Sequence, residues 1–124
     1  MKIFFSTMKA IFPEGKHFIT IMSVRDDLSE RKKTPYFECW FENDLFRMPK
    51  RFYVTGPRQR YLAKLFQAAG IYREHVDTQE LIGKSLCITV EIKENFSEET
   101  GFVQRRREIV WFDSAKHDQH ARAA

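Results

Sequence analysis

The chain has 124 residues and a formal net charge of +4. Hydrophobic residues make up 43% of it and aromatic residues 15%, which excludes a disordered chain and predicts one domain with a real core. The net charge is too small to identify a nucleic-acid-binding protein by itself, so where the charges lie carries more information than their sum.

The two cysteines, Cys39 and Cys87, stand among apolar neighbours at a spacing that fits no metal-binding motif. They predict reduced thiols and a cytoplasmic protein. The apolar stretch near the N-terminus is too short for the core of a secretory signal, and no apolar run reaches membrane-spanning length. We therefore expect a soluble, cytoplasmic protein.

The first predicted strand covers residues 17–24, and a charged loop over residues 25–35 follows it. The second predicted strand covers residues 36–42 and alternates strictly, so that it has two distinct faces. The expected core face carries Phe37, Cys39 and Phe41. The expected exposed face carries Tyr36, Glu38, Trp40 and Glu42.

The third predicted strand covers residues 51–54, with Phe52 and Val54 inward and Arg51 and Tyr53 outward. A helix follows, because Gly56 suits the N-cap, Pro57 the first helical position and Gly70 a left-handed C-terminal residue. Its apolar stripe consists of Tyr61, Leu62, Leu65, Phe66 and Ala69.

The last two predicted strands cover residues 85–92 and 102–112, and an acidic turn over residues 94–101 joins them. The inner face of the fourth strand is formed by Leu86, Ile88, Val90 and Ile92. The end of the chain lacks apolar periodicity. We therefore expect a single domain over residues 1–113 and a frayed tail over residues 114–124.

Three strands, a helix and two strands form the order of the OB-fold, a small five-stranded Greek-key barrel. The sequence thus predicts a mainly β, OB-like barrel with one helix between strands three and four. OB barrels bind oligonucleotides on strands two and three and with the loops that join strands one to two and four to five. The aromatic and basic residues of this chain concentrate on those same elements.

Between residues 50 and 64 the chain carries five positive charges and no negative one: Lys50, Arg51, Arg58, Arg60 and Lys64. Cations near a helix N-terminus oppose the macrodipole at about 0.3–1 kcal/mol each, and the free N–H groups there attract an anion. Arg58 lies on the apolar stripe of the helix and needs a partner. It extends past the helix end, pairs with Glu38 or Glu42, or meets an anion of a ligand.

The residues expected to contact a nucleic acid are of two kinds. Rings that could stack bases, at ~1–3 kcal/mol each, are Tyr36, Trp40 and Tyr53; paired rings also stabilise a sheet that binds nothing. Cations that could contact phosphates are Lys32, Lys33, Arg51, Arg58, Arg60, Arg105 and Arg107, with Arg31 in the same loop as the two lysines. Glu38 and Glu42 would repel phosphate unless an arginine pairs with them.

No catalytic motif or phosphate-binding loop is present in the sequence, so we expect neither enzymatic activity nor a cofactor. His117 and His120 have helical spacing, but two ligands do not make a metal site, and no metal is predicted. The acidic turn is an ordinary hairpin tip or a docking patch for a basic partner.

Several segments resemble a family of small phage and prophage proteins, long labelled as of unknown function, that look like OB-fold accessory proteins binding single-stranded DNA. The matching segments are Pro-Glu-Gly-Lys at 13–16, Pro-Tyr-Phe-Glu-Cys-Trp-Phe-Glu at 35–42, Leu-Ala-Lys-Leu-Phe-Gln-Ala-Ala-Gly-Ile at 62–71, Glu-Leu-Ile-Gly-Lys-Ser-Leu-Cys-Ile-Thr-Val at 80–90 and Val-Trp-Phe at 110–112. The chain departs from the family in its first loop, which is charged instead of glycine-rich.

The resemblance implies sequence-tolerant, non-enzymatic binding of single-stranded nucleic acid, DNA above all, in phage-type replication or recombination. Its partners would be that nucleic acid and replication or recombination proteins. The alternative is a protein-interaction module of a replication, recombination or phage assembly complex that makes no direct contact with nucleic acid.

Overall fold

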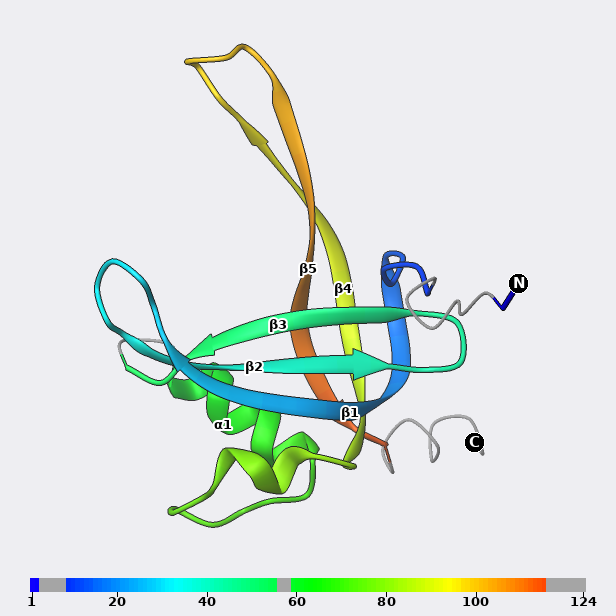
Figure 1. Ribbon diagram of the computed structural model, residues 1–124, viewed down its shortest axis with the longest axis vertical. Coiled ribbons are helices and arrows are strands. Elements are labelled where there is room, and N and C mark those ends of the chain that lie inside the picture. Colours follow the sequence, from blue (N-terminus) through cyan, green and yellow to red (C-terminus); the bar gives the residue numbers. More distant parts are fainter. Residues whose placement is uncertain (3–8, 56–58, 116–124) are drawn as a thin grey trace.

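The computed structural model describes residues 1–2, 9–55 and 59–115, and these residues form a five-stranded antiparallel sheet with one α-helix (Figure 1). The elements in chain order are β1 (Gly15–Leu28), β2 (Pro35–Glu42), β3 (Arg47–Tyr53), α1 (Gln59–Ala68), the short 3-10 helix η1 (Thr78–Leu81), β4 (Ser85–Phe96) and β5 (Val103–Ser114). This confirms the mainly β class and the position of the helix between the third and fourth strands.

The sheet has the strand order β3-β2-β1-β4-β5 and is open, so the predicted closed OB-like barrel is not confirmed. β1 lies in the middle because it pairs with β4 through its first half and with β2 through its second half. Between its first and second halves β1 curls, as Figure 1 shows. The two edge strands, β3 and β5, share side-chain contacts: the ring centres of Phe52 and Phe112 are 5.8 Å apart.

The core confirms the predicted inner face of β2, because Phe37, Cys39 and Phe41 are all buried. The ring of Phe37 stacks on Phe52 of β3 at 5.1 Å. Both cysteines are free and buried, and burial, followed by the charges of Glu38 and Asp26, raises the pKa of Cys39 to about 12. Cys39 therefore behaves as a small apolar side chain of the core.

α1 packs on the sheet through the predicted stripe: Leu65 and Phe66 are buried, and Tyr61, Leu62 and Ala69 are partly buried against the core. The hydroxyl of Tyr61 donates to the carbonyl oxygen of Ile109 in β5. Gly70 has φ of +86°, which confirms its left-handed conformation after the helix. The predicted cap at Gly56 and Pro57 lies outside the described residues, and so does Arg58.

The strands are longer than their sequence patterns predict. β1 continues to Leu28, because residues 25–28 pair with β2 although their side chains are polar or exposed. β3 begins at Arg47 and ends at Tyr53, so the predicted inward position of Val54 is wrong, and its side chain is exposed. Ile92, predicted to be inward, is also exposed, because β4 has left the core by that residue.

The largest difference is a two-stranded arm formed by residues 91–108. Glu91–Phe96 pair with Val103–Glu108, so most of the predicted turn over residues 94–101 belongs to the ladder or to its tip. Figure 1 shows this arm extending away from the rest of the molecule, here called the body. Residues of the arm are largely exposed, since no third strand or helix in the described part of the chain covers them.

Candidate nucleic-acid interface

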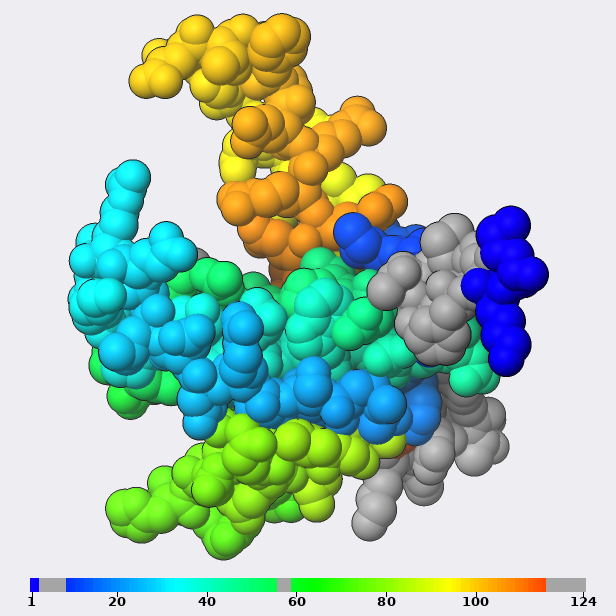
Figure 2. Space-filling model, in the orientation of Figure 1, coloured from blue at the N-terminus to red at the C-terminus, as the bar shows by residue number. Residues whose placement is uncertain are grey.

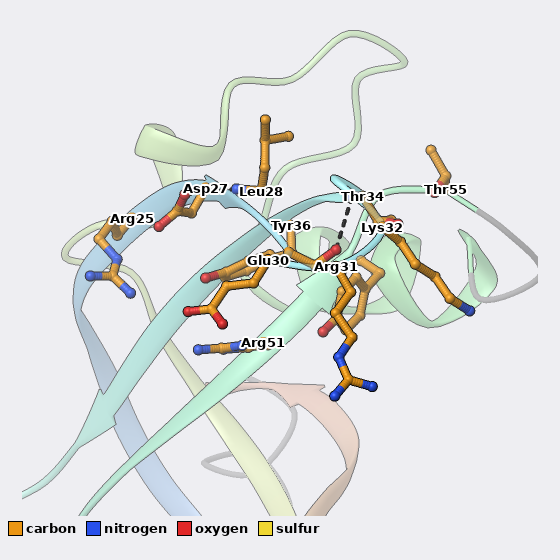
Figure 3. A pocket seen from close by; sticks show the side chains of 12 residues that line it. Arg25, Asp27, Leu28, Glu30, Arg31, Lys32, Thr34, Tyr36, Arg51 and Thr55 are labelled. Atoms are coloured by element: carbon orange, nitrogen blue, oxygen red, sulfur yellow. Dashed lines mark hydrogen bonds between the residues drawn. The ribbon is translucent and has the colours of Figure 1, made fainter.

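A hollow of about 1130 Å³ lies between the β1–β2 loop and the outward side chains at the ends of β2 and β3 (Figure 3). We call it the loop hollow. Its lining residues are Arg25, Asp27, Leu28, Ser29, Glu30, Arg31, Lys32, Thr34, Tyr36, Arg51, Tyr53 and Thr55. Four of the predicted contact residues therefore come together here, namely Lys32, Tyr36, Arg51 and Tyr53.

Strand register brings these side chains together. Directly opposed residues of antiparallel strands project on the same side of the sheet. Arg25, Glu38 and Arg51 form one such row across β1, β2 and β3. Tyr36 and Tyr53 are opposed in the next outward row. Alternation within each strand thus directs Arg25, Glu38 and Arg51 to the solvent side of the sheet. The strand register then places the three side chains next to one another.

Arg51 is the most constrained cation of the loop hollow. Its guanidinium lies 4.7 Å from the ring centre of Tyr36, and its Nε donates to a carboxylate oxygen of Glu38 at 3.4 Å. The hydrogen bond to Glu38, together with the nearby tyrosines, raises the pKa of Arg51. Arg51 is therefore both a fixed positive charge and a support for the ring beneath it.

Glu38 lies between two arginines, since Arg25 approaches its other carboxylate oxygen at 4.0 Å. The sequence predicted repulsion of phosphate by Glu38 unless an arginine paired with it, and the pairing with Arg51 is present. Arg25 is not among the predicted contact residues. The predicted first strand ends at residue 24, whereas β1 continues to Leu28 and pairs Arg25 with Glu38.

Tyr36 corrects the prediction of an exposed base-stacking ring, because only 6% of it is exposed. Its ring is covered by Arg51 and by Tyr53, whose ring centre is 5.7 Å away. Tyr53 is 43% exposed and presents its ring to the hollow. Tyr53 is therefore the accessible platform, and Tyr36 supports it from below.

The β1–β2 loop is a closed turn. The backbone N–H of Ser29 donates to the carbonyl oxygen of Thr34 at 2.9 Å, and the N–H of Thr34 donates to the Ser29 hydroxyl at 2.9 Å. Lys33 has φ of +51° within this turn. Arg31 and Lys32 extend from it as exposed cations on the wall of the hollow, whereas Lys33 does not line it.

Trp40 lies farther along β2, outside the loop hollow. The guanidinium of Arg47 covers its ring at 4.1 Å. Glu42, beside it, binds Lys9 at 2.8 Å and Arg47 at 3.7 Å. The role of Trp40 in stacking a base stays a prediction, and one face of its ring is already occupied by an arginine.

The four described cations of the run between residues 50 and 64 do not converge on one place. Arg51 lines the loop hollow, and Arg60 is exposed near the start of α1. Lys50 lies over the ring of Tyr61 at 5.6 Å, and Lys64 lies over Trp111 at 5.3 Å. The last two cations thus contact aromatic side chains of the fold.

Arg105 and Arg107 line a second hollow, of about 570 Å³, at the base of the arm. We call it the arm hollow, and Ile11, Met48, Pro49, Ile92 and Arg106 complete its lining. Six of the ten predicted contact residues therefore line two hollows at opposite ends of β3, and Lys33, Trp40 and Arg60 line neither. Figure 2 shows the β1–β2 loop in cyan at the left edge of the body and the arm in yellow and orange rising above it.

Among the described residues, no group of three or more His, Cys, Asp or Glu side chains could hold a metal ion. No helix within those ranges is long and apolar enough to cross a membrane. His117 and His120 lie outside the described part of the chain. No protein-family model matches the chain, and no curated protein matches it in sequence. The resemblance to the phage and prophage proteins therefore stays a prediction.

Proposed function

We propose that this protein is a non-enzymatic, sequence-tolerant binder of single-stranded nucleic acid and that the loop hollow is its binding site. One observation carries the proposal: four cations and an exposed aromatic ring line one open hollow. The cations are Arg25, Arg31, Lys32 and Arg51, and the ring is Tyr53. A basic groove with an aromatic platform is the usual construction of sites for single-stranded nucleic acid.

A single strand suits this hollow better than a duplex. A base can lie on Tyr53 only if it has left its neighbours in the stack, as bases of single strands readily do. The ring offers no base-specific hydrogen-bond pattern, and every base has a π-face, so binding tolerates any sequence. Arg31 and Lys32 on the exposed loop line the same hollow, which supports phosphate contacts next to such a base.

The carboxylates of the hollow limit how much phosphate it can hold. Glu38 is balanced by Arg25 and Arg51. Asp27 and Glu30 remain on the wall next to the cations. We therefore propose a short site whose phosphate contacts correspond to the four cations. The resemblance of residues 13–112 to single-stranded-DNA-binding accessory proteins favours DNA as the ligand and replication or recombination as the setting.

The test is fluorescence anisotropy with a labelled oligonucleotide of about 16 nucleotides, the upper end of the site size of one OB-fold. We expect binding at micromolar concentration or tighter in low salt, weakened by Lys32→Glu and by Tyr53→Ala. Lys84→Glu is the matched control, because Lys84 is exposed and lines neither hollow.

Absence of binding at low salt, or binding that Lys32→Glu and Lys84→Glu weaken equally, would overturn the proposal. A partner protein retained after nuclease treatment, combined with no oligonucleotide binding, would instead favour the interaction module.

A further inference from the structure

The arm has one wholly polar side and one mixed side, which carries all of its paired apolar residues together with charged ones. Opposed pairs in its ladder are Glu91 with Glu108, Lys93 with Arg106 and Asn95 with Gln104 on one side. The other side carries Ile92 with Arg107, Glu94 with Arg105, and Phe96 with Val103. Alternation of this kind is typical of a ribbon that is solvated on one side and covered on the other.

Within the described chain, the apolar side chains at the tip end of this mixed side are uncovered. Phe96 is 66% exposed and Val103 is 55% exposed. A two-stranded ribbon by itself is at best marginally stable in water, and contiguous exposed apolar side chains mark interaction sites. The arm therefore has the features of a surface that a partner covers.

The arm hollow is complementary to the arm tip. It is formed by the apolar side chains of Ile11, Met48 and Ile92, with arginines at its rim. The tip, residues 96–103, combines exposed Phe96 and Phe102 with two carboxylates and contains no cation. Apolar side chains and opposite charges thus lie at the two ends of the same arm.

The charged side chains at the base and at the tip of the arm are also free to pair with a partner. Arg107 forms no ion pair with any described residue, and the same holds for Glu98 and Glu99 at the tip. The middle of the arm is different, because Arg105 and Glu94 already pair with each other at 3.0 Å. The uncompensated positive and negative charges are therefore separated along the arm.

We propose that the arms of two copies of this chain pack against each other in a two-fold symmetric dimer, the tip of each arm seated in the arm hollow of the other copy. Glu94 lies midway between Ile92 and Phe96, which are about 13 Å apart at roughly 3.3 Å per residue. A two-fold axis beside Glu94 therefore places Phe96 of each copy over Ile92 of the other.

In this arrangement the same surface serves both copies, as a two-fold interface requires. The acidic tip of one copy approaches the base of the other copy's arm, where Arg107 lies. The dimer does not depend on nucleic-acid binding, since the loop hollow lies at the other end of β3 and stays open.

The test is sedimentation equilibrium of nuclease-treated protein, with two opposite charge reversals: Arg107→Glu, and Glu98→Lys combined with Glu99→Lys. We expect a wild-type dimer whose dissociation constant rises tenfold or more in either variant. In a mixture of the two variants, each tip again meets the opposite charge at position 107 of the other copy. We therefore expect heterodimers that contain one copy of each variant. This rescue separates a broken contact from a misfolded chain. Lys84→Glu is the control and should remain as dimeric as the wild type.

A monomeric wild-type protein would overturn the proposal, and so would a dimer that Phe96→Ser and both charge reversals leave unchanged. Loss of oligonucleotide binding by Arg107→Glu in a protein that is monomeric throughout would assign the arm hollow to nucleic acid instead. A monomer that retains another protein through Phe96 would assign the arm to a different partner.

Discussion

Arg51 stacks on the ring of Tyr36 at 4.7 Å and at the same time donates to Glu38. The side chain that provides a fixed cation in the loop hollow therefore also covers the tyrosine that forms its floor. Loss of Arg51 would remove a proposed phosphate contact and uncover an aromatic ring in one step. Exposed Lys32 is for this reason the cleaner probe of electrostatic binding.

Arg51→Lys separates the two roles of Arg51. The substitution keeps the charge but loses the planar group that stacks and hydrogen-bonds. We expect a lower melting temperature than wild type, with a salt dependence of oligonucleotide binding close to that of wild type. Differential scanning calorimetry and anisotropy titrations measure the two effects. An unchanged melting temperature would show that the contact with Tyr36 and Glu38 is energetically neutral.

The salt dependence of oligonucleotide affinity should report how many cations of the loop hollow contact phosphates. Four phosphate contacts predict a slope of log affinity against log salt of about −3, at roughly −0.7 per contact on single strands. Lys32→Ala should reduce the magnitude of the slope by about 0.7. Lys33→Ala is the matched control, because Lys33 does not line the hollow. Equal effects of both substitutions would contradict the assignment of Lys32.

The two tyrosines should respond differently to truncation. Tyr53→Ala should weaken oligonucleotide binding by about 1–3 kcal/mol, because it removes the exposed stacking platform. Tyr36→Ala should lower the free energy of unfolding by about 3 kcal/mol, because it leaves a cavity at a buried position. Urea unfolding and anisotropy on both variants test this. A larger loss of stability in Tyr53→Ala than in Tyr36→Ala would reverse the roles.

Cys39 should make stability fall at high pH. Its pKa is raised from 9.0 to about 12 in the folded state. Its contribution is complete below pH 9, and it is lost as the pH rises from 9 towards 12, since only the unfolded thiol ionises there. At pH 10 the loss should be about 1 kcal/mol. The difference in unfolding free energy between wild type and Cys39→Ala, measured from pH 7 to 10, isolates this effect.

Glu80 should support η1 only above acidic pH. Its carboxylate accepts from the backbone N–H of Asp77 at 2.9 Å, completes a capping box and pairs with Arg73. The Asp77 N–H, then Arg73, lowers the pKa of Glu80. Its contribution is therefore present above its ordinary pKa and lost as the pH falls through the lowered value. Glu80→Gln should lower the melting temperature at pH 7 more than at pH 3.

The sequence by itself determined which side chains of β2 and of α1 form the core-facing side of each element. Alternation predicts Phe37, Cys39 and Phe41 as the inner face of β2, and a 3.6-residue stripe predicts the buried side of α1. Both are confirmed, as is the left-handed conformation of Gly70. Such features depend on neighbours within a few residues of the same chain segment.

Only the tertiary structure decided what happens on the outward side of the sheet. Strand register places Arg51 over Tyr36 and buries a ring that alternation exposes. Pairing across β4 and β5 turns a predicted acidic turn into a long arm and carries Arg105 and Arg107 away from the loop hollow. Register and strand length depend on residues distant in sequence, so local periodicity predicted the faces but not which cations meet.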